Sequence, residues 1–427
     1  MKKKVLVVGG GGREHTLVWK LAQSPRVGKI FIAPGNPGTS QWGENVDIAT
    51  SNIPALVAFA RKEKVDLTVV GPDDPLAAGI VDIFQKEKLL VFGPSQRAAQ
   101  VEWSKAFSKQ FMEKYKLPTA EFQTFTDYEQ ALEYIHQKAV PIVIKASGLA
   151  LGKGVFICHT KTEAQNALKD LLVQKTLGEA GAQVVIEEYL DGPEISAHIV
   201  SDGDHHIVFP FAQDHKRIGD GNTGPNTGGM GSYAPLSWVS KGESHLISKE
   251  VIEPTMRALR EEIGCFQGCL FPGLMMIASG PKLLEFNARF GDPETQSYMR
   301  LLESDLYEML EGAAKGALAD VTPIWSEQHA VCVVLTSAGY PGVYEKGKVI
   351  SGLEGAEKIP GVVVFHAGTA VSGGALVTSG GRVLGVSAVA GTLQEAVDKA
   401  YQAVGKIHFD GMYYRRDIAY QGLASKS

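Results

Sequence analysis

Cysteine and long apolar runs are both scarce in this chain of 427 residues. Only four cysteines occur, and the one close pair, Cys265 and Cys269, has no second pair and no histidine partner at zinc-site spacing. Ordinary reduced thiols are therefore expected. The first apolar run covers residues 5–8 and stops at four glycines, which is too short for the core of a signal peptide or for a membrane span. A cytoplasmic protein with no membrane partner is the expectation.

Basic tracts are scarce as well, since no Lys/Arg-rich stretch goes beyond the short lysine trio at residues 2–4. The formal net charge is -5 and the sequence pI is about 6.2. Because this balance gives no electrostatic footing for a polyanion, we expect no nucleic-acid partner. An apolar fraction of 44% is ample for several buried cores, and the length predicts two to four domains. A monomer is expected, although the sequence alone does not fix the oligomeric state.

Four short β-branched runs near the N-terminus each end abruptly at glycine or proline, with helical patterns between them. They cover residues 5–8, 29–32, 67–70 and 89–92. Continuous apolar runs that alternate with helices predict a parallel, doubly wound sheet, whose ligands lie beyond the carboxyl ends of the strands. The loops that follow, at 9–12, 34–38, 71–75 and 93–95, are therefore expected to form one crevice.

Three regions are expected: an N-terminal domain over 1–101, a central region over 102–325 and a C-terminal domain over 326–427. The central region carries nearly all of the recognisable chemistry. The C-terminal region shows a hairpin signal at Ser379-Gly380-Gly381, a helix near 393–406, and strand-like pieces at 330–336, 362–367, 375–378 and 382–388. No catalytic constellation is evident in it.

The turn of four glycines at 9–12 follows the first strand and opens a helix. Its backbone N–H groups could cradle a phosphate at the helix N-terminus. As a dinucleotide fingerprint the turn fails, because Glu14 or His15 stands at the third glycine position and no acidic residue ends the second strand. A substrate phosphate is favoured over a bare tight turn, and NAD binding is the least favoured of the three.

A second glycine-rich loop joins two short strands and carries lysines, with the sequence Lys145-Ala146-Ser147-Gly148-Leu149-Ala150-Leu151-Gly152-Lys153-Gly154. A flexible lysine-bearing loop can fold over ATP phosphates. It is not a Walker A motif, because Gly152-Lys153 is followed by glycine where that motif needs Ser or Thr opening a helix. A flexible hairpin without a ligand is the alternative.

An apolar strand at 184–186 leads through Glu187-Glu188-Tyr189-Leu190 into an acidic turn that ends at Glu194. Backbone groups along an exposed strand edge could read an adenine here, while Glu194 accepts hydrogen bonds from ribose hydroxyls. A solvated acidic strand end is an equally good interpretation of this segment alone.

Residues 212–217 (Ala-Gln-Asp-His-Lys-Arg) precede a segment, 219–231, that contains six glycines. A loop so rich in glycine is not a rigid core element, and a long loop inside a compact domain is usually functional. His215 alone carries little weight, because an isolated histidine is more often a hydrogen-bonded structural residue.

The most informative segment covers residues 283–296. Strand alternation places Glu285, Asn287 and Arg289 on one face and apolar residues on the other. A carboxylate and an amide oxygen two residues apart suit a divalent ion held against nucleotide phosphates, and the arginine next along suits an oxyanion. A half-buried strand with a polar outer face is the alternative.

In chain order, Lys105, Lys145, the glycine-rich loop, the 187–194 segment and Glu285-x-Asn287 resemble the ATP-grasp arrangement. Within that superfamily the chain resembles the phosphoribosylamine–glycine ligase family. The resemblance spans nearly the whole chain and rests on Gly-Gly-Arg-Glu-His (11–15), Ala-Gln-Asp-His-Lys-Arg (212–217), Gly-Pro-Asn-Thr-Gly-Gly-Met-Gly (224–231) and Arg-Phe-Gly-Asp-Pro-Glu-Thr-Gln (289–296). It departs from the expected pattern at Asp73, Pro193 and Asn222, none of which removes a predicted phosphate or metal ligand.

The resemblance implies a multi-domain α/β protein with three parts. These are a doubly wound pre-ATP-grasp domain, a two-lobed α+β ATP-grasp region with a mobile lobe near 120–190, and a small α/β domain at the C-terminus that closes over the site. The implied reaction joins glycine to 5-phosphoribosylamine and gives glycinamide ribonucleotide, ADP and phosphate through glycyl phosphate, a step of de novo purine biosynthesis. The alternatives are another ATP-grasp carboxylate–amine ligase, a dinucleotide-binding oxidoreductase and a non-catalytic ATP-binding regulator.

The resemblance also implies residue roles. The ATP ligands would be Lys105, Lys145, Gly152, Lys153, Glu187, Glu188, Tyr189, Leu190 and Glu194. Mg²⁺ or Mn²⁺ would be held by Glu285 and Asn287. The catalytic residues would be Lys145, Arg289 and Asp214, with Arg289 pairing with the glycine carboxylate and Asp214 with its ammonium. The substrates would contact Gly10, Gly11, Gly12, Asp214, Lys216, Arg289 and Asp292. The loop at 148–154 would close over the acyl phosphate and exclude water.

Overall fold

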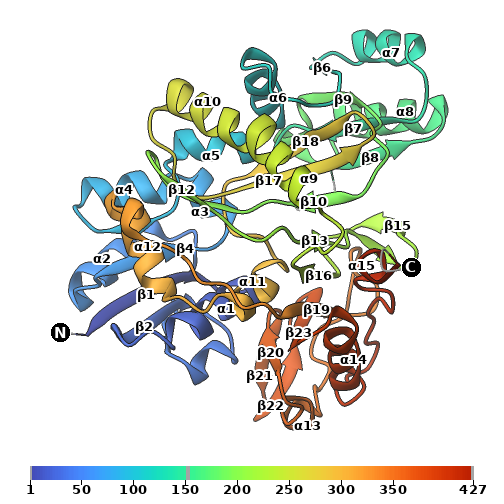
Figure 1. Cartoon of the computed structure of the whole chain (residues 1–427). Helices are drawn as coiled ribbons and strands as arrows, with labels where there is room; N and C mark the ends of the chain where they lie inside the picture. The colour runs from blue at the N-terminus through green and yellow to red at the C-terminus, as the bar shows by residue number, and fades with distance from the viewer. Residues whose placement is uncertain (1, 151–153, 425–427) are drawn as a thin grey trace.

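In the computed structural model, which describes residues 2–150 and 154–424, the N-terminal region forms a parallel sheet in the order β3-β2-β1-β4-β5 (Figure 1). Alternate residues of β1 pack on opposite faces. Val5 and Val7 lie in one core with Leu17 of α1, whereas Leu6 and Val8 lie in another with Leu56 of α2. Helices therefore cover both faces, and the predicted doubly wound sheet is confirmed.

The strands and helices of this region have the following bounds. The strands are β1 (Lys3–Gly9), β2 (Val27–Pro34), β3 (Glu44–Asn45), β4 (Leu67–Val70) and β5 (Val91–Phe92). The helices are α1 (Gly12–Leu21), η1 (Thr39–Gln41), α2 (Ile53–Glu63), α3 (Asp73–Ala77) and α4 (Ile80–Lys86). The apolar run at 89–92 gives a strand only in its second half. Its first residue still closes the preceding helix, because the Leu89 N–H donates to the Phe84 carbonyl at 2.9 Å.

Two helices lead out of the N-terminal region, α5 (Gln96–Trp103) and α6 (Lys105–Lys114). Each begins at a serine whose hydroxyl accepts a hydrogen bond from a backbone N–H of the first turn, Ser95 from Ala98 and Ser104 from Phe107. The second cap fixes the start of α6 at Lys105, so the side chain of this lysine has a defined origin.

A small antiparallel sheet with its own core follows, in the order β6-β9-β7-β8. Its elements are β6 (Phe122–Phe125), α7 (Tyr128–Gln137), β7 (Ile142–Ala146), β8 (Val155–Cys158), α8 (Lys161–Leu168), η2 (Lys169–Val173), η3 (Gly178–Gly181) and β9 (Val184–Glu188). Ile135 of α7 and Ala164 of α8 pack with Ile144 and Ile186 of the sheet. This unit, at the upper right of Figure 1, coincides with the lobe expected near 120–190. Its mobility stays a prediction.

The larger central sheet runs β10-β17-β11-β12, with β18 on the free side of β17. The strands are β10 (Glu194–Ser196), β11 (Ile199–Asp202), β12 (His206–Val208), β17 (Gln267–Ile277) and β18 (Gly280–Asn287). The neighbouring helices are α9 (Lys241–Ile247), η4 (Ser248–Ile252), α10 (Glu253–Ile263), α12 (Leu306–Lys315) and η5 (Leu318–Asp320). Since α12 packs on β5 as well as on β11 and β17, it joins this sheet to the N-terminal one.

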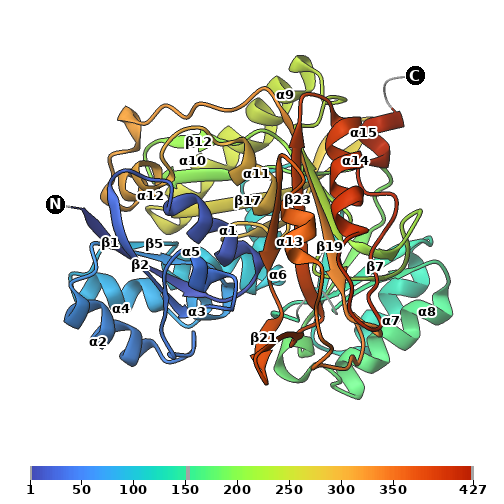
Figure 2. The same cartoon turned by 90° about the horizontal axis from the view of Figure 1, so that it is seen from below.

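The third large sheet runs β13-β16-β19-β23-β20 and crosses the boundary expected at 325/326. Its strands are β13 (Gln213–Asp214), β16 (Gly231–Ala234), β19 (His329–Thr336), β20 (Val362–His366) and β23 (Arg382–Ala390). One face packs on α11 (Thr295–Leu301), and α14 (Leu393–Val404) runs along β19 and β23 (Figure 2). Two strands from the central part of the chain are thereby tied to the C-terminal part.

The hairpin predicted at Ser379-Gly380-Gly381 is wrong. The strand before it, β22 (Ala375–Thr378), pairs with β21 (Thr369–Ser372) through a turn at Gly373 and Gly374, which have φ values of 58° and 79°. The Ser379 N–H instead donates to the Gly368 carbonyl at 2.8 Å, and the chain then enters β23. The remaining elements are the hairpin β14 (Arg217–Gly219) with β15 (Thr223–Asn226), α13 (Leu353–Glu357) and α15 (Tyr420–Ala424).

None of the helices in the described parts of the chain has the length and hydropathy needed to cross a membrane.

Candidate functional site

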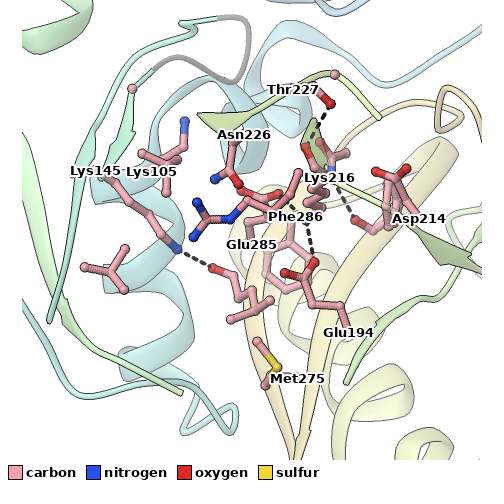
Figure 3. A pocket seen from close by; sticks show the side chains of 18 of the residues that line it. Lys105, Lys145, Glu194, Asp214, Lys216, Asn226, Thr227, Met275, Glu285 and Phe286 are labelled. Carbon is pink, nitrogen blue, oxygen red and sulfur yellow. Dashed lines mark hydrogen bonds and ion pairs between the residues drawn. The ribbon is translucent and has the colours of Figure 1, made fainter. Parts of the chain in front are cut away.

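A cavity of about 990 Å³ lies between the small sheet and β18 (Figure 3). Its lining collects most of the residues singled out from the sequence: Lys105, Lys145, Glu187, Glu188, Tyr189, Leu190, Glu194, Asp214, Lys216, Glu285, Asn287, Arg289 and Asp292. Figure 3 shows Lys105 and Lys145 on one side, Asp214 on the other, and Glu285 between them. Gly152 and Lys153 lie outside the described residues.

One end of the cavity, here called the lysine end, is defined by Lys105, Lys109, Lys145, Lys216, Glu187 and Glu285. Glu187 is only 2% exposed, and its Oε2 atom lies 3.0 Å from Lys145 Nζ and 3.1 Å from Lys109 Nζ. Lys109 also donates to Thr119 Oγ1 at 2.7 Å, and burial lowers its pKa to about 8. Lys105 donates to the Gly148 carbonyl at 3.5 Å, so it reaches the base of the 148–154 loop.

Lys216 bridges two carboxylates at this end. Its Nζ atom lies 2.9 Å from Glu194 Oε2 and 3.5 Å from Glu285 Oε1. Burial alone would raise the pKa of Glu285, but Lys216, Lys145 and Lys105 together lower it to about 2. Glu285 is therefore fully ionised at neutral pH.

The chain that follows β9 supplies the free backbone of the site. An exposed strand edge is one of the two interpretations of the segment 184–194, and within residues 184–188 the structure shows none, because β9 has β6 on one side and β7 on the other. The Glu188 N–H is also occupied, since it donates to the Glu121 carbonyl at 2.9 Å. Backbone groups facing the cavity begin only where pairing ends, at Tyr189 and Leu190.

Glu285 and Asn287 have the donor chemistry of a hard divalent cation, a carboxylate and an amide oxygen on one face of β18. Asn287 Oδ1 accepts from Arg289 Nη2 at 3.2 Å, so one of its two lone pairs is used by the protein. Among residues 2–150 and 154–424, no group of three or more His, Cys, Asp or Glu side chains could enclose a metal. The pair fits an ion that takes its other ligands from a substrate and water.

The other end of the cavity, here called the carboxylate end, is defined by Asp214, Glu294 and Arg289. Burial and then the neighbouring Glu294 raise the pKa of Asp214 well above its usual range, and burial also raises the pKa of Glu294. Within the described residues, Asp214 Oδ1 and Arg289 Nε are buried and have no hydrogen-bond partner. Each atom needs a partner from a ligand or from a rearrangement of its neighbours, and a small ligand that carries both a cation and an anion would match both charges.

Arg289 and His215 are each held by other residues of the protein. Arg289 Nη2 lies 3.0 Å from Glu102 Oε1, whose other oxygen accepts from the Ala288 N–H at 2.8 Å. His215 accepts from the Ala419 N–H at 3.2 Å through Nε2, and its Nδ1 lies 3.2 Å from the Gly231 carbonyl. Both ring nitrogens are used, so His215 is the hydrogen-bonded structural residue that the sequence favoured.

A second cavity, of about 500 Å³, lies where the N-terminal loops meet the C-terminal region. Gly10 and Gly11 line it, whereas Gly12 is the first residue of α1 and faces Gln296. The Gly11 N–H already donates to Glu14 Oε2 at 2.7 Å. A phosphate bound to that N–H would have to displace the Glu14 carboxylate, so the phosphate role of Gly11 stays a prediction.

Three of the four predicted crevice loops contribute to this second cavity, through Gly9, Pro34 and Pro72. The loop at 93–95 does not belong to this lining. Pro94 packs against Gly268 at the start of β17, where a Cβ atom would come within 2.9 Å of the proline. The fourth loop is therefore used to attach the N-terminal sheet to the central one.

Sequence reasoning missed several lining residues. Lys109 stands four residues after Lys105 on the same helix face, a spacing that could have indicated it. Glu294 lies inside a motif already singled out. Arg382 and Tyr340 come from the C-terminal region, where no constellation was expected, and no local pattern indicates them.

A cavity between two sheets, with buried lysines from β7 and α6 on one side and a carboxylate–amide pair on β18, is the arrangement of an ATP-grasp enzyme. The matching family descriptions are phosphoribosylglycinamide synthetase N domain (residues 3–102), ATP-grasp (A) domain (103–295) and C domain (330–421). The phosphoribosylamine–glycine ligase of Vibrio cholerae is 48% identical over 424 residues, 99% of each chain. This chain belongs to the phosphoribosylglycinamide synthetase family and is an ATP-dependent ligase.

Solved structures agree with this membership. The crystal structure of phosphoribosylamine–glycine ligase from Thermotoga maritima superposes with a TM-score of 0.82 at 35% identity, covering 97% of this chain and 100% of that one. The biotin carboxylase domain of the Hydrogenobacter thermophilus 2-oxoglutarate carboxylase gives a TM-score of 0.74 at 17% identity, covering 96% and 91%. The second likeness concerns the fold alone.

Proposed function

We propose that this chain joins glycine to 5-phosphoribosylamine at the expense of ATP, giving glycinamide ribonucleotide, ADP and phosphate in purine biosynthesis. The observation that carries the proposal is the carboxylate end of the main cavity. Asp214 Oδ1 and Arg289 Nε are buried there without partners, beside a cavity rich in lysine. An amino acid supplies an ammonium for the first and a carboxylate for the second, whereas ATP supplies anionic oxygens but no ammonium.

ATP is placed with its adenine against the backbone of Tyr189 and Leu190, where strand pairing has ended. Glu194 follows four residues after Leu190 and is the acceptor for the ribose hydroxyls. Its carboxylate also pairs with Lys216. The phosphates extend toward Lys105 and Lys145. Lys145 can leave Glu187 and pair with the phosphates, because Glu187 remains paired with Lys109.

Glu285 and Asn287 are the proposed ligands of Mg²⁺ or Mn²⁺. Their support is the donor set on one strand face and the low pKa of Glu285, which keeps this carboxylate charged. A divalent ion bound there would neutralise part of the phosphate charge during transfer. Lys216 lies against Glu285 and orients its carboxylate.

The chemistry is positioning plus electrostatics. A carboxylate oxygen of glycine attacks the γ-phosphorus, the bond to the β-phosphate oxygen breaks, and ADP leaves glycyl phosphate behind. The amine of phosphoribosylamine then attacks the carbonyl carbon, the bond between that carbon and the phosphate oxygen breaks, and the departing phosphate accepts the amine proton. Arg289 holds the glycine carboxylate and Asp214 its ammonium, while Gly10 to Gly12 remain the candidates for the ribosyl phosphate.

The experiment is to supply Mg-ATP, glycine and freshly generated phosphoribosylamine, omitting each in turn, and to follow phosphate together with glycinamide ribonucleotide by mass spectrometry. Amide formation that requires all three substrates is the expected result. Phosphate release with a different carboxylate and amine, and none with these, would contradict the substrate assignment. The ATP-dependent ligase assignment would stand.

The proposal extends to the setting of the enzyme. A cytoplasmic location is supported by four free thiols, as expected in a reducing compartment. A monomer is proposed, and sedimentation would test it. The segments 1–101, 102–325 and 326–427 are proposed as the three domains. Two strands of the second segment, β13 and β16, complete the sheet of the third.

A further inference from the structure

The two cavities share a wall, and the Asp292 carboxylate stands in it. Asp292 lines the main cavity, and its Oδ2 atom is 3.8 Å from the point that a Cβ on Gly11 would occupy. Gly11 lines the second cavity. On the other side, a Cβ on Gly12 would lie 3.6 Å from Asp292 Oδ1 and 3.6 Å from Ala367, which also lines the second cavity. Asp292 therefore lies between residues that line the main cavity and residues that line the second cavity.

Arg382, the first residue of β23 in the C-terminal region, binds Asp292. Its Nη2 lies 3.0 Å from Asp292 Oδ2, and its Nη1 donates to the Asp292 carbonyl at 2.6 Å. Gln296 holds the second carboxylate oxygen at 2.6 Å. Both oxygens and the carbonyl of Asp292 are thus fixed, two of them by one guanidinium.

The same guanidinium holds the turn that presses on the carboxylate end. Arg382 Nη1 donates to the carbonyls of Gly228 (2.5 Å) and Gly229 (3.5 Å). A Cβ on Gly229, whose φ is +110°, would lie 2.8 Å from Asp214 Oδ1, so only glycine lets the turn approach this closely. From the same C-terminal region, Tyr340 Oη accepts from the Gly228 N–H at 2.9 Å.

The backbone of Arg382 is hydrogen-bonded to a residue that lines the second cavity. Its carbonyl accepts from the Gly368 N–H at 2.9 Å, and Gly368 lines that cavity. The main chain of Arg382 therefore contacts Gly368 of the second cavity. Its side chain contacts Asp292 and the Gly228–Gly229 turn.

We propose that Arg382 is a positioning residue for amide formation, which fixes Asp292 and the Gly228–Gly229 turn so that an acyl group in the main cavity and an amine in the second cavity meet. This inference rests on the proposed function and assigns to the C-terminal region a part in the second half-reaction. Within the described residues, no hydrogen bond or ion pair of Arg382 reaches Lys105, Lys145 or Glu285, so ATP binding at the lysine end is not expected to depend on it.

Loss of this positioning has a chemical signature. When the amine attacks glycyl phosphate, its nitrogen bonds to the carbonyl carbon, the carbon–oxygen bond to phosphate breaks, and one phosphate is released for each amide. When the amine is misplaced, water attacks instead and returns glycine and phosphate, so ATP is consumed without product. A misplacement of about 1 Å can cost about 10²-fold in rate.

The test uses the full-length enzyme and measures phosphate released per glycinamide ribonucleotide, together with KM for ATP. Arg382→Gln is expected to raise the ratio well above one and to lower kcat/KM for phosphoribosylamine by about 10²-fold, with KM for ATP unchanged. Arg382→Lys keeps the charge and one donor, and it is expected to restore part of the coupling. If Arg382→Gln does not fold, the ratio of phosphate to glycinamide ribonucleotide measured with Arg382→Lys tests the proposal instead.

Arg300→Gln is the matched control. Arg300 also donates across to the C-terminal region, from Nη2 to the Gly361 carbonyl at 2.7 Å, but it lines neither described cavity. It should lower thermal stability and leave the ratio at one. If a folded Arg382 variant also keeps a ratio of one, Arg382 is only structural and the proposal is wrong. If the wild-type enzyme forms no amide from these substrates, the proposed function fails first, and the ratio measured with its true substrates decides on Arg382.

Discussion

At the lysine end of the main cavity the charged side chains are paired with one another, whereas at the carboxylate end Asp214 and Glu294 form no ion pair within the described residues. Glu285 has three lysines around it and a pKa lowered to about 2. Asp214 has Glu294 as its neighbour, a raised pKa and a buried oxygen without a partner within the described chain. Both ends lie in one cavity and both contain carboxylates, so their difference comes from which side chains the fold brings beside those carboxylates.

The comparison separates two ways of binding. At the lysine end the protein supplies the counter-charges before the substrate binds. The charge on the phosphates changes during transfer, and fixed charges of the protein stabilise that change most effectively. At the carboxylate end the missing counter-charge is left to the ligand. A substrate that brings an ammonium is then favoured over a simple carboxylic acid, because only the ammonium stabilises the ionised form of the buried Asp214.

Removing the charge of Glu285 should have the largest effect. Glu285→Gln preserves shape but deletes the proposed metal ligand, and we expect kcat to fall by about 10³-fold because transfer loses charge neutralisation at the phosphates. Phosphate release at saturating substrates measures it, and a metal titration should show weaker Mn²⁺ binding. Glu250→Gln, on an exposed residue, is the control and should match wild type. Near-normal kcat in Glu285→Gln would show that the lysine end does not hold the metal.

The carboxylate end should respond in KM and not in the use of ATP. Asp214→Asn removes the proposed partner of the glycine ammonium, and KM for glycine is expected to rise by about 10²-fold, since truncating one member of a buried charge pair costs several kcal/mol. KM for ATP should not change. Asp47→Asn, at an exposed aspartate, serves as the control. A rise in KM for ATP, with glycine unaffected, would reverse the assignment of the two ends.

The opposite pKa shifts predict opposite pH behaviour. Asp214 must lose its proton to bind an ammonium, and its pKa is raised, so glycine binds more tightly as the pH increases above the ordinary carboxylate range. KM for glycine should fall with pH, by at most about tenfold per unit for one proton. KM for Mg-ATP should stay flat, because Glu285 is ionised throughout. Asp214→Asn should abolish the glycine slope, and a slope that survives in this variant would exclude Asp214 as its source.

The smallest effect concerns the pairing of Glu187. Lys109→Met leaves Glu187 with Lys145 as its partner, so we expect a loss of about 1–2 kcal/mol in the free energy of unfolding. Lys109→Met combined with Lys145→Met leaves a buried carboxylate unpaired and should cost about 3–5 kcal/mol. Urea unfolding measures both. Strictly additive losses would mean that the two lysines do not share Glu187.

Local patterns in the sequence predicted those parts of the molecule that local physics determines. The apolar runs that became β1 and β4 are buried on both faces, so their continuous hydrophobicity identified a parallel sheet. Strand alternation in β18 placed Glu285 and Asn287 on the cavity side, whereas Arg289 lines the cavity from two residues beyond the end of the strand. The family resemblance supplied Lys105, for which composition gave no signal.

Long-range pairing was beyond the sequence. The free edge expected on β9 is occupied by β6, a segment some sixty residues earlier whose register no local pattern encodes. The Ser379-Gly380-Gly381 signal was a real turn, but its strands pair elsewhere, because β23 joins β19 and β20. Arg382 meets Asp292 across 90 residues of chain, and an arginine that opens a strand carries no sign of its partner.

The most direct test of the account is an isotope transfer. With oxygen-18 in the glycine carboxylate, the wild-type enzyme should release phosphate that contains one labelled oxygen, since that oxygen attacks the γ-phosphorus and leaves with it when the amine attacks. The glycinamide ribonucleotide should retain the other label. Unlabelled phosphate formed alongside the amide would mean that glycine is never phosphorylated, and the assignment of the two ends of the cavity to acyl-phosphate chemistry would be wrong.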